Sequence, residues 1–186
     1  YELLTVSKRN SNCAIAAPYI TSDKDGYSML PENGKSVIRT REQINCSKLL
    51  NNLKPSGDLC VQVTKGCTLL INSKHFIDVG MFNSKYFLFW EEVDLCRKFL
   101  KKKLSIIVSS KAFAHHKGGT SAKKSLSVYI IRIFHSEKSP LLYSNVKKNS
   151  LSMYFIILKY LFRSISYFCI LNFKNSLKNI VKLSAI

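Results

Sequence analysis

The chain has 186 residues, 46% of them hydrophobic, so it can bury a core and does not have the composition of a disordered protein. Lys and Arg outnumber Asp and Glu by 29 to 11, and residues 97–186 contain 18 basic residues against one acidic residue. A neutral half beside a basic half predicts a polyanionic partner, which is nucleic acid, an anionic membrane surface or a phosphorylated substrate.

The first sixty residues contain few regular elements. Residues 1–9 are consistent with the end of a helix, and residues 13–17 form an apolar run that predicts a buried strand stopped by Pro18. Residues 21–26 predict a turn, and residues 27–58 predict polar loops with one possible strand at 36–40.

The middle of the chain has stronger signals. Residues 61–72 give the strongest strand pattern, interrupted by Gly66. Ser73 is expected to cap a short helix over residues 74–79, which ends before Gly80.

A helix is predicted over residues 91–103. One apolar face recurs at the helical period, and Asp94 and Lys98 form an i,i+4 pair on another face. Acidic residues open this helix and lysines close it, which suits the helix dipole. The apolar face consists of Leu95, Cys96, Phe99 and Leu100.

Two short strands, at residues 105–109 and 112–116, are predicted after this helix, followed by a flexible loop at 117–121. The six cysteines include no C-x-x-C and no zinc-type spacing, and most lie in apolar runs. We therefore expect reduced, buried cysteines in a cytoplasmic protein.

The last third of the chain is both apolar and basic. Residues 151–173 are very apolar, but Lys159 and Arg163 interrupt them four residues apart, which favours an amphipathic helix lying in a membrane interface. An ordinary packed helix with a solvated basic face and a membrane-spanning helix are the alternatives. A lysine stripe continues at i,i+4 spacing through Lys174, Lys178 and Lys182.

Three carboxylates open the helix that begins at residue 91. On their own they are most simply a response to the helix dipole at a wet surface. Their context is more specific, because four aromatic residues precede them and the segment His115–Gly119 follows about twenty residues later. The aromatic residues, of a kind that stacks on sugar rings, are Tyr86, Phe87, Phe89 and Trp90.

Five segments together resemble the family 2 (GT-A fold) inverting glycosyltransferases, and the bacterial rhamnosyltransferase-like branch that builds surface polysaccharides is the most similar. The resemblance covers residues 1–122, and the segments occur in the family's order and spacing. They are Ala14–Gly26, Gly66–Ile71, Phe76–Phe82, Tyr86–Cys96 and His116–Ser121.

The resemblance implies a role for each site residue. Glu92 aligns with the general base that takes the proton of the acceptor hydroxyl, and Glu91, Asp94 and Trp90 belong to the acceptor pocket. Gly66 allows the backbone to approach a sugar closely, and His116 aligns with a histidine that can join the metal shell.

Several positions depart from the family pattern. Glu92 replaces the usual Asp, which places the carboxylate about one methylene further out. Asn83 occupies a position where the family often has Asp. Lys98 occupies a position where Arg is usual, and Ser110 one where Pro is usual.

The resemblance also implies a domain organisation. Residues 1–122 correspond to the acceptor side of a GT-A, Rossmann-like α/β domain without its N-terminal nucleotide-binding half, and residues 123–186 to a tail of basic amphipathic helices. The metal-holding Asp-x-Asp of the family is not among these residues, because Asp23 and Asp25 follow the wrong strand. We expect about 80–100 further residues upstream.

The function implied is transfer of a sugar, such as rhamnose, from a nucleotide-sugar donor to a saccharide or lipid-linked acceptor. The complete enzyme is expected to use Mn²⁺ or Mg²⁺, and the isolated chain is expected to be inactive. We expect a peripheral location on the inner face of the cell membrane, through the C-terminal helices. The alternative is a non-catalytic basic protein that binds membranes or nucleic acid, and no nucleic-acid-binding motif favours the latter.

Overall fold

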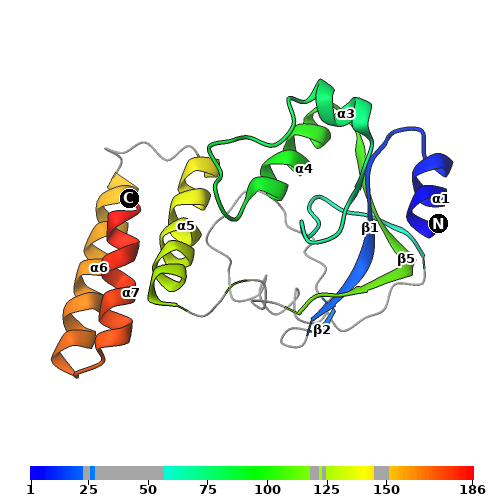
Figure 1. Cartoon of the computed structure of the whole chain (residues 1–186). Coiled ribbons are helices and arrows are strands. Elements are labelled where there is room, and N and C mark those ends of the chain that lie inside the picture. The colour runs from blue at the N-terminus through cyan, green and yellow to red at the C-terminus, as the bar shows by residue number, and fades with distance from the viewer. Residues whose placement is uncertain (23–25, 28–56, 118–121, 123–124, 145–150) are drawn as a thin grey trace. The chain divides into compact units, whose positions relative to one another are not determined.

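A computed structural model of the chain describes residues 1–22, 26–27, 57–117, 122, 125–144 and 151–186. The chain divides into two compact units (Figure 1). The sheet unit comprises Tyr1–Lys85 and Glu91–Ser121, and the helical unit comprises Tyr86–Trp90 and Ala122–Ile186. The protein is therefore mixed α/β, as the sequence predicted.

The sheet unit contains a five-stranded mixed sheet in the order β2-β1-β5-β3, with β4 also paired to β1. β1 and β5 are parallel and run side by side from the pair Cys13 and Ser105 to the pair Thr21 and His115, whereas the other pairings are antiparallel. The strands are β1 Cys13–Ser22, β2 Gly26–Tyr27, β3 Leu59–Cys60, β4 Leu70–Ile71 and β5 Ser105–His115.

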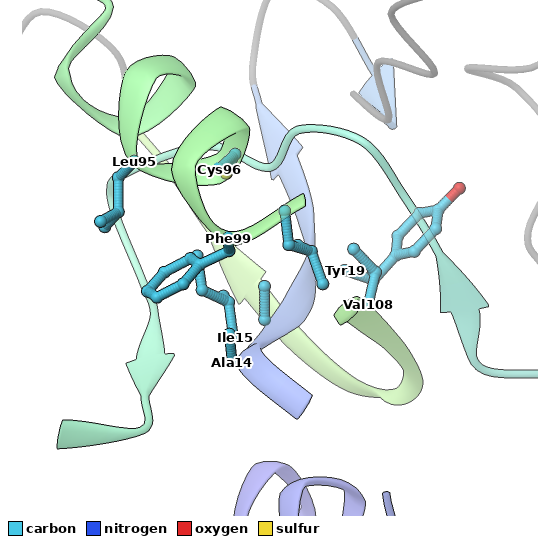
Figure 2. Packing of buried hydrophobic residues seen from close by; sticks show 9 residues of the cluster. Ala14, Ile15, Tyr19, Leu95, Cys96, Phe99 and Val108 are labelled. Carbon is cyan, nitrogen blue, oxygen red and sulfur yellow. The ribbon is translucent and has the colours of Figure 1, made fainter. Parts of the chain in front are cut away.

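The core lies on both faces of β1, which explains why residues 13–17 are continuously apolar. On one face, residues of β1 and β5 pack against α4 (Glu91–Lys101), and Figure 2 shows Phe99 directed at this face of the sheet. On the other face, Val6 of α1 (Glu2–Arg9) packs against Cys13 and Ile107. The residues of the first cluster are Ala14, Ile15, Ala17, Tyr19, Leu95, Cys96, Phe99, Ile106 and Val108.

The expected end of β1 at Pro18 was wrong, because the strand continues to Ser22. The register with β5 changes at this point, from Pro18 opposite Ser109 to Tyr19 opposite Phe113. Proline has no N–H to donate to a ladder, and the irregularity in β5 accommodates the missing bond. The two strands predicted at 105–109 and 112–116 are therefore one strand with a break in register.

The strand predicted over residues 61–72 was also wrong over most of its length. Only the two residues of β4 form a strand within this range, because β3 ends at Cys60, just before it. The apolar side chains of Val61, Val63 and Leu69 still pack against the core, but from an irregular connection. Burial, rather than strand pairing, accounts for the pattern. The possible strand at 36–40 and much of the predicted turn and loop lie outside the described residues.

The helices of the sheet unit follow the prediction closely. α3 spans Ser73–Asp78, but its N-cap is Asn72, whose side-chain oxygen accepts a hydrogen bond from the backbone N–H of His75 at 3.2 Å. α4 ends at Lys101, and Asp94 lies 3.4 Å from Lys98 as predicted. Leu100 is exposed, so its place on the buried face was wrong.

The helical unit consists of α5 (Leu126–Ser144), α6 (Leu151–Cys169) and α7 (Phe173–Ser184). α6 and α7 lie side by side as a hairpin (Figure 1). Glu137 of α5 joins the other two helices, because it accepts a hydrogen bond from Tyr160 Oη at 2.6 Å and pairs with Lys182. None of the helices in the described part of the chain is long and apolar enough to cross a membrane.

The prediction for the cysteines is confirmed in part. The five cysteines in the described residues are all free thiols, and Cys13 and Cys96 are buried. Burial was wrongly expected for Cys60, Cys67 and Cys169, which are exposed.

Candidate functional site

The candidate site is built on the first turn of α4, which carries Glu91, Glu92 and Asp94. The two residues before it, Phe89 and Trp90, both have positive φ angles, of 66° and 72°. A bulky side chain in the left-handed region costs on the order of 1 kcal/mol or more. The backbone is therefore strained directly before the acidic turn, as it often is beside functional sites.

Glu92 lies against the irregular connection between β3 and β4. A Cβ placed on Gly66 would stand 3.3 Å from Glu92 Cβ, 3.5 Å from Cγ and 3.6 Å from Cδ. The absence of a side chain at position 66 therefore makes room for the stem of Glu92. The sequence predicted that Gly66 allows a close approach to a sugar, and here the approach is to the predicted base itself.

Two further residues complete the surroundings of Glu92. Cys96, one helical turn further along α4, is fully buried, and its thiol hydrogen-bonds to the backbone of Thr64, a buried residue of the same connection. Burial, and to a smaller extent the charge of Glu92, raises the pKa of the Cys96 thiol to about 11. The thiol is therefore protonated at neutral pH and acts as a neutral packing group beside the carboxylate.

The carboxyl of Glu92 is held in an environment that disfavours its charge. Burial raises its pKa above the usual 4.5, and the neighbouring charge of Glu91 raises it further, against an opposing backbone hydrogen bond. Within the described part of the chain, no hydrogen-bond partner reaches the buried Oε2 of Glu91 or of Glu92. An unsatisfied buried oxygen costs about 1–3 kcal/mol, so these two atoms are unusual in a folded protein and mark the acidic turn as a candidate site.

The Oδ2 of Asp94 is also buried without a hydrogen-bond partner in the described residues, but Asp94, unlike the two glutamates, has a cation within ion-pair distance. Its Oδ2 lies 3.4 Å from Lys98 Nζ, and Lys98 in turn donates a hydrogen bond to the carbonyl of Met81 at 2.9 Å. The lysine therefore ties α4 to the segment that follows α3, and it neutralises one of the three acidic charges. Glu91 and Glu92 remain as the carboxylates without a cation within ion-pair distance in the described residues.

The aromatic segment before α4 belongs to the helical unit. The rings of Phe87 and His135 are 4.9 Å apart, and those of Trp90 and Tyr143 are 5.0 Å apart. The buried hydroxyl of Ser139 donates a hydrogen bond to the carbonyl of Leu88 at 2.8 Å. This segment was predicted to stack on sugar rings, and part of its aromatic surface is used to pack on α5.

His116 follows the last residue of β5 and is half-buried. The structure brings Gly66, Glu91, Glu92 and Asp94 together around the start of α4, whereas His116 lies outside this helix, just after the end of β5. Among the described residues, no group of three His, Cys, Asp or Glu side chains could hold a metal ion. The metal role of His116 stays a prediction.

Sequence reasoning missed two contributors to this site. Cys96 could have been found, because its four-residue spacing from Glu92 places both on neighbouring turns of one helix. Thr64 carries no such signal, since it acts through its backbone.

Comparison with models of known protein families finds no match, and comparison with curated proteins finds no significant relative.

Proposed function

We propose that residues 1–122 form the acceptor side of an inverting, GT-A-type glycosyltransferase and that Glu92 is its general base. The observation that carries the proposal is the carboxyl of Glu92, which combines a raised pKa with a buried oxygen that lacks a hydrogen-bond partner in the described residues. The order and spacing of the five sequence segments supply the reaction class.

The chemistry follows from these features. The Glu92 carboxylate takes the proton of an acceptor hydroxyl while that oxygen forms a bond to the anomeric carbon of the donor sugar. The bond from this carbon to the nucleoside diphosphate breaks on the opposite face, and the configuration inverts. A raised pKa makes the carboxylate a stronger base, which favours general base catalysis.

The neighbours of Glu92 support this role. Gly66, in the β3–β4 connection, leaves room for the stem of Glu92, and the protonated thiol of Cys96 one turn along α4 is held by the backbone of Thr64. Such packing limits the number of positions that the carboxylate can adopt, and a base must be held close to its working geometry. Glu91 contributes a like charge that raises the pKa of Glu92 further.

The divalent metal that the resemblance implies would stabilise the diphosphate leaving group. In this chain only His116 is proposed as a ligand. The donor-binding residues and the Asp-x-Asp pair belong to the upstream half that we expect in the complete enzyme. Glu92, Gly66, Thr64 and Cys96 all belong to the sheet unit.

Binding of an acceptor can be tested on the chain as it stands. Trp90 is its single tryptophan, so its fluorescence reports directly on the segment before Glu91. We expect rhamnose-containing and related oligosaccharides to shift this emission in a saturable manner, with the effect retained in Glu92→Gln. No response to a broad panel of saccharides would contradict the proposed acceptor site.

A further inference from the structure

The outward side of α6 is apolar over almost its whole length. Eight large side chains on this side are exposed, whereas Met153, Tyr160 and Ser164 on the opposite side are buried. The eight residues recur at spacings of three and four, so they form one stripe on the helix. This surface, called the α6 outer face below, consists of Leu151, Tyr154, Phe155, Leu158, Leu161, Phe162, Ile165 and Phe168.

The stripe is long and continues past the helix. At about 1.5 Å per residue, the 19 residues of α6 extend roughly 28 Å. Ile170, Leu171 and Phe173, in the turn to α7 and at its start, are exposed as well, and the rings of Phe168 and Phe173 lie 5.6 Å apart. Phe162, for example, leaves 73% of its surface accessible to solvent. An apolar surface of this length is not expected to remain in water.

Cations border the α6 outer face. Lys159 and Arg163 are exposed on one flank of the same helix, and Lys174 and Lys178 are exposed on α7. Residues 151–186 contain five Lys and Arg residues and no Asp or Glu. Lys182 differs from the other four, because it pairs with Glu137 and so stabilises the helical unit itself.

We infer that the α6 outer face is a docking surface for an anionic lipid membrane. The helix lies parallel to the bilayer plane with its apolar stripe at the boundary of headgroups and acyl chains, and Lys159 and Arg163 contact lipid phosphates. The basic residues favour an anionic surface over a neutral one. The aromatic and aliphatic side chains of the stripe insert into the bilayer. The basic stripe expected from the sequence therefore flanks the contact, while the apolar face makes it.

The test is flotation of the full chain with vesicles that contain phosphatidylglycerol, compared with vesicles of phosphatidylcholine alone. We expect binding to the anionic vesicles that weakens between 0.1 and 0.5 M salt. Phe162→Ser is expected to lower the partition coefficient roughly ten-fold. Ile77→Ser removes an apolar side chain of similar exposure from α3 and serves as the matched control, with no change expected.

A charge-reversal pair tests the flank. Lys159→Glu with Arg163→Glu is expected to abolish binding, whereas Lys102→Glu with Lys111→Glu changes the net charge equally on the sheet unit and is expected to retain most of it. Circular dichroism melting checks that each variant folds. Phe162→Trp in a Trp90→Phe background is expected to shift its fluorescence emission to the blue on binding.

Two outcomes would overturn the inference. One is equal loss of vesicle binding in both charge-reversal pairs, which indicates attraction by net charge without a docking face. The other is self-association of the chain through this face, seen by analytical ultracentrifugation and removed by Phe162→Ser, with no binding to either kind of vesicle.

Discussion

Glu92 and Gly66 fit each other so closely that a single methyl group on Gly66 would stand 3.3 Å from Glu92 Cβ. That Cβ is anchored in the first turn of α4 and cannot swing away as the tip of a long side chain can. The position of the carboxyl therefore depends on a residue that contributes no side chain at all.

Gly66→Ala is expected to destabilise the protein by about 1 kcal/mol, because α4 or the β3–β4 connection must move by a few tenths of an ångström. Gly57→Ala is the matched control, since a Cβ there meets nothing within 4 Å. It should be neutral or slightly stabilising. Chemical denaturation measures both, and equal stability of the two variants would show that the contact is unimportant.

The stability of the protein should depend on pH through Glu92. Its pKa is raised above 4.5 in the folded protein, so the folded state binds this proton more tightly than the unfolded chain. Its contribution to the free energy of unfolding is fully present below pH 4.5 and is lost as the pH rises through the raised pKa. Glu92→Gln should therefore gain stability relative to the native protein at pH 7, with the difference shrinking toward pH 4. Glu2→Gln controls for the change in net charge, and a constant difference across this range would argue against the raised pKa.

Trp90 should report on its packing against Tyr143, whose ring centroid is 5.0 Å away. Tyr143→Ala exposes the indole ring to water and should shift its emission to the red. Tyr154→Ala removes an exposed tyrosine of α6 and should leave the emission unchanged. Identical spectra for the two variants would mean that this ring contact does not shield Trp90.

The helical unit should depend on Glu137, which accepts the hydrogen bond of Tyr160 and pairs with Lys182. Burial and this hydrogen bond raise the pKa of Tyr160 well above its usual range. Glu137→Ala leaves both partners without their acceptor and is expected to cost about 1–3 kcal/mol, because the pair is only partly exposed. Lys178→Ala, on the exposed side of α7, should cost much less in the same thermal melts.

Local signals explain which parts of the fold were predictable. α4 carries both a helical apolar period and charges suited to its dipole, and the structure confirms it to within two residues. The connection from residue 61 to 69 has a strand's apolar content but is not a strand, although the Val61 N–H still bonds to the carbonyl of Ile106 in β5. Strand pairing depends on β1 and β5, which are distant in sequence. The expectation that Pro18 ends β1 was wrong for a similar reason. The strand continues because the register with β5 changes at Pro18, and this irregularity lies in a strand that is distant in sequence.

The candidate site was predictable to a similar extent. Glu91, Glu92 and Asp94 lie on one helical turn, so sequence alone places them together. The resemblance predicted that Gly66 allows the backbone to approach a sugar, whereas its neighbour in the structure is the stem of Glu92, which depends on tertiary packing. The ring contact between Trp90 and Tyr143 joins residues more than fifty positions apart in the sequence, so no local pattern predicts it.

The proposed role of Glu92 as general base is tested most directly by sugar transfer. For this test, the donor-binding half of an active family 2 glycosyltransferase is joined upstream of Tyr1. With nucleotide-activated rhamnose and related donors, we expect metal-dependent transfer. Glu92→Gln should lower kcat at least about 100-fold and leave KM for the acceptor within a few-fold, and Glu91→Gln should have a smaller effect. Full activity with Gln at position 92 would contradict the assignment.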